Sequence, residues 1–285
     1  MIIDAHQHFL EYTAHPDHYV WMNSAYSQLR RNYLPEHLLP LLVENGVEGT
    51  VAVQARELRE ETLFLLAISD RCPFVKGVVG WLDLCATTLD ADLEHCTEHP
   101  KLSGLRMLIH DQLDVDFADS PAHLRGVSRL SNYNLTYDLL LKPIHLPAAT
   151  RLVDHYPNQM FVVDHIAKPD ILRGEIEPWR SGIADIGRRP NVFCKLSSMI
   201  TQAHWQTWLP EQIEPYLDWT LECFGAQRLM IGSDWPVSTC ATDYKTTMNL
   251  VVQWAARLSP TEQLAVLGNS CSRFYHLGES LPCPE

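Results

Sequence analysis

Two histidines separated by one residue stand near the start of the chain, in the run Asp4-Ala5-His6-Gln7-His8. Side chains two residues apart on an extended strand point to the same side, so the two imidazoles are expected to converge. Converging imidazole nitrogens suit either a divalent metal ion or the stabilisation of a negatively charged oxygen. When the pair is considered alone, two partly exposed histidines without a function remain the plainer interpretation.

Two further polar residues follow apolar runs that look like strands. Asp234 lies within residues 232–236, and His165 follows the run 160–164. Separately, an aspartate there is usually a turn residue and a lone histidine is usually structural. In a closed barrel, however, the first and eighth strands are neighbours, and all strand C-termini meet on the catalytic face. The sequence therefore predicts one active site containing Asp234, His165, His6 and His8.

Eight short apolar runs recur along the chain, with helical patterns between them. Most runs are continuous rather than alternating, which is typical of strands buried on both faces of a parallel sheet. No glycine-rich phosphate turn follows the first run, which argues against an open doubly wound sheet. We therefore predict an α/β protein formed by a single (β/α)₈ TIM barrel domain over residues 1–285. The predicted strands are residues 2–4, 49–53, 75–81, 104–109, 135–141, 160–164, 192–196 and 228–231.

Helix signals are present between several of these strands. Helices are predicted over residues 35–45, 60–71 and 211–224 from their apolar spacing. Two more are predicted to open at Ser120, which precedes a proline, and at Ser259, which begins a capping box. The long first loop, residues 9–33, is expected to lie across the C-terminal face of the barrel.

The overall composition excludes several classes of partner. The net charge is −13, from 22 basic and 35 acidic residues, so binding to the phosphates of a nucleic acid is not expected. No signal-like segment opens the chain, and no apolar run is long enough to span a membrane. The eight cysteines are scattered, without a Cys-x-x-Cys pair, which is typical of reduced thiols in a cytoplasmic protein.

The chain resembles the amidohydrolase superfamily, and more closely its sugar-lactonase group typified by L-fuconolactonase. The resemblance runs in order along nearly the whole chain. It implies a hydrolase in which Asp234 assists the attack of water on a sugar lactone. The matching segments are residues 3–9, 53–56, 80–84, 195–197, 232–237, 268–270 and 274–275.

The chain departs from the metal-rich members of that superfamily. Its fifth strand, residues 136–141, lacks their histidine, and its fourth, residues 104–107, lacks their bridging lysine or glutamate. The resemblance therefore implies at most one divalent ion, zinc by preference, which related lactonases do not all require. Its ligands would be His6, His8 and Asp234. Met107 also replaces a histidine that this group tends to carry, so the sugar specificity is expected to differ.

Polar and aromatic side chains at other strand ends are candidates for binding the substrate. Arg106 is equally well explained as an ion-paired barrel residue, the aromatic residues as core, and Lys168 as a solvated side chain. The substrate-binding candidates are Gln54, Arg56, Asp83, Arg106, Trp81, Trp21 and Lys168.

The predicted reaction is the hydrolysis of a sugar lactone, an aldonolactone such as L-fuconolactone, to the aldonic acid. Two alternatives stay open at this point. One is a decarboxylase acting on a small unsaturated or aromatic acid with a similar His/Asp set. The other is a barrel that binds a small molecule without turnover. The identity of the lactone and any homo-oligomeric state also stay open.

Overall fold

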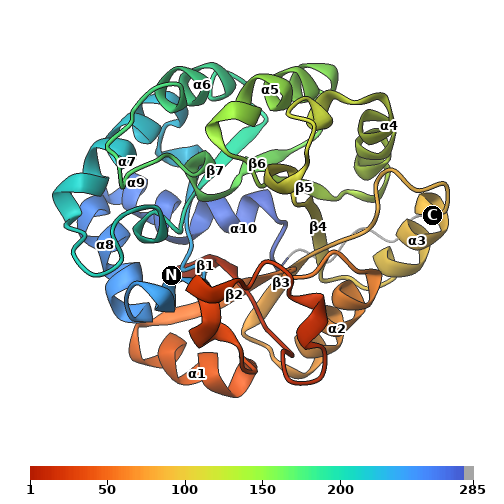
Figure 1. The fold of residues 1–285 in the computed structure, drawn as a ribbon, viewed down its shortest axis with the longest axis horizontal. Helices are drawn as coiled ribbons and strands as arrows, with labels where there is room; N and C mark the ends of the chain where they lie inside the picture. Colours follow the sequence, from red (N-terminus) through yellow and green to blue (C-terminus); the bar gives the residue numbers. More distant parts are fainter. Residues whose placement is uncertain (279–285) are drawn as a thin grey trace.

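The computed structural model describes residues 1–278 and shows eight parallel strands in the order β1 to β8. Consecutive strands pair with one another along the chain, and helices cover the outside of the resulting sheet, as Figure 1 shows. The strands are β1 (Ile2–Gln7), β2 (Val47–Val53), β3 (Val75–Gly80), β4 (Leu102–Met107), β5 (Thr136–Leu139), β6 (Phe161–Val163), β7 (Val192–Leu196) and β8 (Leu229–Ile231).

The sheet closes where the C-terminal end of β1 meets the segment that follows β8. Gln7 forms a parallel bridge with Trp235, and the His8 amide donates to the Trp235 carbonyl at 2.7 Å. The Asp234 amide in turn donates to the His6 carbonyl at 2.8 Å. The prediction of a single (β/α)₈ barrel is therefore confirmed. The predicted domain also includes residues 279–285, which lie outside the described residues.

Ten α-helices occur among the described residues, most of them in the outer ring of Figure 1. Local sequence fixes several helix starts. The Asp243 carboxylate accepts from the Thr246 amide at 2.7 Å, and Ser259 and Glu262 form the predicted capping box. The helices are α1 (Pro35–Glu44), α2 (Arg59–Arg71), α3 (Leu89–Thr97), α4 (Pro121–Leu130), α5 (Leu146–His155), α6 (Trp179–Ile186), α7 (Pro210–Phe224), α8 (Tyr244–Ala255), α9 (Pro260–Leu264) and α10 (Ser270–Phe274).

The apolar core has two parts. The larger part includes the side chains between the strands and the surrounding helices, and the smaller part includes inward-facing strand residues such as Ala5, Val53 and Phe193. Phe274 and Tyr275, at the end of α10, belong to this smaller cluster. In Figure 1, α10 runs across the barrel behind the strands. It therefore packs against the inward-facing side chains and leaves the strand C-termini to form a site.

The first loop is held against the strand ends by specific contacts. The Trp21 indole donates to the Ala55 carbonyl just after β2 at 3.0 Å, and Leu10 pairs with Tyr33 at the base of the loop. The loop therefore lies across the catalytic face, as its position in the sequence predicts. Among residues 1–278, no helix combines the length and the hydropathy that crossing a membrane would need.

Candidate active site

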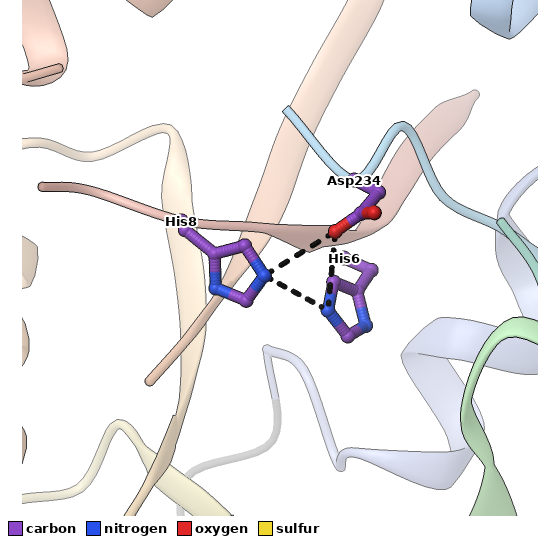
Figure 2. A group of neighbouring side chains, drawn as sticks. All are labelled: His6, His8 and Asp234. Carbon is purple, nitrogen blue, oxygen red and sulfur yellow. Dashed lines mark hydrogen bonds and ion pairs between the residues drawn. The ribbon is translucent and has the colours of Figure 1, made fainter. Parts of the chain in front are cut away.

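The structure brings His6, His8 and Asp234 together at the seam where the barrel closes (Figure 2). The Nε2 atoms of His6 and His8 are 3.3 Å apart. The Oδ1 atom of Asp234 lies 3.3 Å from Nε2 of His8 and 3.9 Å from Nε2 of His6. All three side chains are buried, so three polar atoms converge on one small volume away from bulk water.

Neighbouring groups orient both imidazoles. Nδ1 of His8 lies 2.7 Å from the Val53 carbonyl, which only accepts, so Nδ1 carries a proton and Nε2 faces Asp234 and His6. Nδ1 of His6 lies 3.4 Å from Oδ1 of Asp164 and 3.2 Å from the Lys195 ammonium, so charged groups of both signs hold the ring. Burial lowers the pKa of His6 well below its usual range, so His6 is neutral at pH 7.

These residues fit a single divalent ion. Two imidazole nitrogens and one carboxylate oxygen converge within 4.8 Å of one another, and two imidazoles with one carboxylate form a common set of protein ligands for catalytic zinc. The Val53 carbonyl supplies an outer hydrogen bond that orients His8, and Asp164 is an outer charged neighbour of His6. The donor set thus agrees with the predicted ligands His6, His8 and Asp234.

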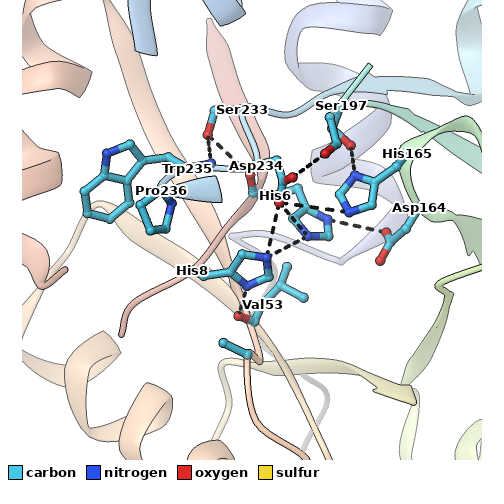
Figure 3. Close-up of polar contacts among 12 residues, drawn as sticks. His6, His8, Val53, Asp164, His165, Ser197, Ser233, Asp234, Trp235 and Pro236 are labelled. Carbon is cyan, nitrogen blue, oxygen red and sulfur yellow. Dashed lines mark hydrogen bonds and ion pairs between the residues drawn. The ribbon is translucent and has the colours of Figure 1, made fainter. Parts of the chain in front are cut away.

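His165 approaches the same carboxylate from the end of β6. Its Nε2 lies 4.0 Å from Oδ1 of Asp234, and its Nδ1 lies 2.8 Å from the hydroxyl of Ser197, as Figure 3 shows. His165 begins four consecutive residues with positive φ, His165 to Lys168, which form a left-handed turn without any glycine. Such backbone is strained, and strain of this kind is concentrated at functional sites. Burial lowers the pKa of His165 well below its usual range, so its ring is neutral at pH 7.

Asp234 is the one carboxylate at the centre of this group. Its own φ is +56°, and its second oxygen, Oδ2, accepts a short hydrogen bond from Ser198. Burial alone would raise the pKa of Asp234, but His165, His8 and the Ser198 hydroxyl stabilise the charged form and bring the pKa to about 2. An ionised carboxylate therefore stands beside the neutral imidazoles of His6 and His165 at neutral pH.

A buried charged network lies beneath the histidines. The Lys195 ammonium is 2.5 Å from Asp138, 3.0 Å from Asp164 and 3.2 Å from Nδ1 of His6. Arg106 donates to Asp164 at 3.0 Å, and its Nη1 lies 3.2 Å from Nε2 of His6. Burial would raise the pKa of Asp164, yet Lys195, His6 and Arg106 hold it well below its usual range. This network fixes His6 from below.

The second candidate ligand group, His6, Asp164 and His165, lies within this network. Each Asp164 oxygen already has a positively charged neighbour, Lys195 on one side and Arg106 on the other. A second divalent ion would bring two more positive charges against these two cations. The residues present therefore fit one ion and not a pair, in agreement with the absence of a histidine on β5.

A cavity of about 520 Å³ opens above the catalytic group. Of the predicted residues, it is lined by His8, His165, Asp234, Arg106, Lys168 and Trp21. His6 lies below the cavity floor. One side of the cavity is aromatic, with the ring centroids of Tyr26 and Trp21 5.9 Å apart. Another side is cationic and includes Lys168 and Lys142. Burial lowers the pKa of Lys168.

Four predicted substrate-binding residues do not line the cavity. Gln54 is buried and contacts the Arg106 backbone, and Arg56 is paired with Glu61 at 2.5 Å. Asp83 is exposed and accepts from the Cys85 amide at 2.9 Å. Trp81 packs against the apolar core. The structure gives these four side chains structural partners.

Several residues near the site were not recognised from the sequence. Asp164 directly precedes His165, and Lys195 and Asp138 are charged residues inside otherwise apolar strands. A charged residue in a strand buried on both faces needs a partner, which is the signal that could have revealed them. Ser198 and His110, which line the cavity, carry no comparable signal.

The chemistry available to this group is the activation of water beside an electrophilic carbon. Asp234 is an ionised carboxylate that can accept a proton, and the surrounding imidazoles and Lys168 can donate to an oxygen that gains negative charge. The seven cysteines that the structure describes are free thiols, and none lies in the catalytic group.

Comparison with known proteins agrees with this geometry. The amidohydrolase family model matches residues 3–277. The L-fucono-1,5-lactonase of Burkholderia ambifaria is 37% identical over 279 residues, which cover 96% of this chain and 95% of that protein. The L-fucono-1,5-lactonase of Burkholderia multivorans is also 37% identical, with 97% and 96% covered.

A solved structure of similar fold also contains a metal. The crystal structure of a Burkholderia multivorans amidohydrolase with bound zinc has a TM-score of 0.91 at 36% identity, and the match covers 97% of this chain and 99% of that chain. Its likeness extends over the whole barrel. The chain therefore belongs to the amidohydrolase family, as its motifs predict.

Proposed function

We propose that this protein hydrolyses a sugar lactone, an aldonolactone such as L-fucono-1,5-lactone, to the open-chain aldonic acid. The observation that carries the proposal is the ionised Asp234 carboxylate, held among three histidines at the floor of a cavity large enough for a monosaccharide. Two relatives that are 37% identical and named L-fucono-1,5-lactonase support the substrate class.

In the proposed reaction, Asp234 is the general base. Its Oδ1 accepts a proton from the water that attacks the lactone carbonyl carbon, and a new carbon–oxygen bond forms. The ring carbon–oxygen bond then breaks, and the proton on Asp234 passes to the leaving alkoxide. One water is consumed, and the product is a hydroxy acid.

The histidines have distinct proposed roles. If Ser197 donates to Nδ1 of His165, the Nε2 proton of His165 is free to stabilise the carbonyl oxygen as it becomes negative. His8 lies on the other side of the carboxylate, with its Nε2 3.3 Å from Oδ1 of Asp234. A divalent ion held by His6, His8 and Asp234 would supply Lewis-acid polarisation of the carbonyl.

The cavity walls are proposed to bind the rest of the sugar. Trp21 and Tyr26 offer apolar ring faces, and Lys168 offers a hydrogen-bond donor to a ring substituent. Arg106 lines the cavity but is also ion-paired with Asp164, so its proposed role is mainly to position His6. No specific observation favours decarboxylation or binding without turnover, and neither is proposed.

The seven cysteines that the structure describes are free thiols, which is typical of proteins in a reducing compartment. We propose that the protein acts on its lactone in the cytoplasm. An oligomeric assembly stays a prediction, and gel filtration with light scattering would measure it.

A pH-indicator assay over a panel of aldono-1,4- and 1,5-lactones of different stereochemistry tests the function. Acid release above the spontaneous rate, from at least one lactone, is the expected result. Parallel reactions with a chelator and with added zinc measure whether a metal is needed. Failure on every lactone in both conditions would contradict the proposed activity and leave the fold unaffected.

A further inference from the structure

Ser198, directly after β7, has an unfavourable backbone conformation. Its φ is +58°, in the left-handed region that glycine adopts without strain and other residues adopt only with strain. The side chain is 4% exposed and lies at the cavity floor. Strained residues are concentrated at functional sites, where their side chains are needed. The strain at Ser198 therefore suggests a function for its hydroxyl.

The hydroxyl of Ser198 is part of a chain of hydrogen bonds. An ionised carboxylate accepts only, so the single Ser198 proton is donated to Oδ2 of Asp234. The Thr201 hydroxyl lies 2.7 Å from the Ser198 hydroxyl and 2.7 Å from the Ser198 carbonyl, so its single proton faces two acceptors on Ser198. The Gln202 amide donates to the Thr201 hydroxyl at 3.1 Å. Thr201 thus holds Ser198 through both its hydroxyl and its carbonyl, and Ser198 donates to the carboxylate.

This chain determines which oxygen of Asp234 faces the reaction. Because Oδ2 is held by Ser198, Oδ1 is the oxygen that lies 3.3 Å from Nε2 of His8 and 4.0 Å from Nε2 of His165. Without the Ser198 hydroxyl the carboxylate can rotate about its last bond. A glycine at position 198 would remove the strain and the hydroxyl together.

We propose that Ser198 is a positioning residue, which holds the Asp234 carboxylate in its reactive orientation with the support of Thr201. The proposal rests on the proposed function for its kinetic test, because Asp234 is assigned there as the base. It extends that function by giving a positioning role to Ser198, which does not itself contact the reacting atoms.

Ser198→Gly is the decisive variant. Loss of a hydrogen bond to a charged group predicts a kcat about ten- to a hundredfold lower on the lactone that the wild type hydrolyses. KM should stay within about twofold, because Ser198 acts through Asp234 rather than on ground-state binding. The melting temperature should change little, since relief of backbone strain opposes the loss of the bond.

Asn134→Gly is the matched control. Asn134 is exposed, has a φ of +55° and lies outside the site, so the same kind of substitution relieves the same kind of strain without touching Asp234. Its kcat and KM should equal those of the wild type.

A double-mutant cycle tests the role of Thr201. Thr201→Val keeps the shape of the side chain and removes its hydroxyl, so kcat should fall less than in Ser198→Gly. Because Thr201 is proposed to act only through Ser198, the double variant should be no slower than Ser198→Gly alone. Fully additive losses would show that the two residues act separately and would contradict the proposed chain.

Zinc affinity gives a readout that does not depend on lactone turnover. Competition with a chromophoric chelator should show zinc binding about ten- to a hundredfold weaker in Ser198→Gly, because an outer hydrogen bond to a ligand is lost. If the wild type hydrolyses no lactone, the proposed function fails and zinc affinity alone decides the role of Ser198.

Three results would overturn the positioning role. The first is unchanged kcat and unchanged zinc affinity in Ser198→Gly. The second is a loss of activity matched by an equal fraction of unfolded protein. The third is a wild type that neither hydrolyses a lactone nor binds zinc.

Discussion

At the scale of single residues, burial and pairing separate charged side chains with structural partners from those that face the cavity. Arg56 and Asp234 both follow strands and were both expected at the site. Asp234 faces a cavity, whereas Arg56 is 4% exposed and its guanidinium lies 2.5 Å from the buried Glu61 carboxylate. Glu61 also accepts from the Ala55 amide at 3.0 Å, so the pair fixes the turn after β2. This turn carries the carbonyl that holds Trp21.

Removing the Arg56 side chain should therefore lower the free energy of unfolding more than it changes substrate binding. Arg56→Met leaves Glu61 buried without its cation, a change that costs about 3–5 kcal/mol. Urea denaturation measures the free energy of unfolding. Arg59→Met, which breaks the partly exposed ion pair with Asp92, is the control and should cost less than about 1 kcal/mol. A large increase in KM with unchanged stability would instead place Arg56 at the substrate.

At the scale of elements, interactions between neighbouring segments fix the loops and helices around the barrel. His123 on α4 is an example, since its Nδ1 lies 2.9 Å from the Ala118 carbonyl and its Nε2 lies 2.7 Å from the Tyr137 hydroxyl on β5. The helix is thus linked both to the preceding loop and to the barrel. Burial lowers the pKa of His123 to about 4.

This shift predicts a loss of stability in acid. Between about pH 6.5 and pH 4 the unfolded chain binds a proton at His123 that the folded chain does not, so the free energy of unfolding falls as the pH falls. His123→Gln cannot bind that proton. Its deficit relative to the wild type should therefore shrink by about 2 kcal/mol between pH 7.5 and pH 5. Urea titrations at both values measure it, and a constant deficit would contradict the assigned shift.

The elements also show how far the sequence could be interpreted. Every strand and the helices α1, α2, α4, α7 and α9 were predicted, because apolar runs and proline or serine starts are local signals. Helices α3, α5, α6 and α8 were not, although α3 buries Leu89, Leu93 and Cys96 on one face. The helix has only nine residues, so this apolar spacing repeats too few times to distinguish it from a loop.

Within the site, the convergence of His6, His8, His165 and Asp234 could be predicted because each lies at or just after the C-terminal end of a strand. The backbone of the left-handed turn at residues 165–168 could not, since no glycine marks it. The pairing of Lys195 with Asp138 could not either, because the two residues are brought together only by β5, β6 and β7 lying in order.

At the scale of the whole molecule, the site depends on closure of the barrel between β1 and β8. Gly232 lies at this seam, where a Cβ atom would come within 2.9 Å of the His6 Cβ and 3.2 Å of the His6 amide nitrogen. Neither of these atoms can move without moving β1. The small residue therefore lets the two strand ends approach closely enough for Asp234 to reach the histidines.

Gly232→Ala should force this seam apart. Overpacking of this kind costs about 1–3 kcal/mol of stability, and kcat should fall with it because His6 shifts relative to Asp234. Thermal unfolding and lactone turnover measure the two effects. Gly49→Ala on β2 is the control, since the three atoms nearest to its Cβ would all belong to the flexible Lys76 side chain. If Gly232→Ala behaved like Gly49→Ala, close approach at the seam would not matter.

The most direct test of the account compares two aspartates in one assay. Asp234→Asn removes the proposed base, whereas Asp243→Asn changes only the N-cap of α8, where asparagine caps equally well. With the best lactone substrate, kcat of Asp234→Asn should fall by about 10²- to 10⁴-fold, and Asp243→Asn should match the wild type. Near-normal turnover by folded Asp234→Asn would contradict the account.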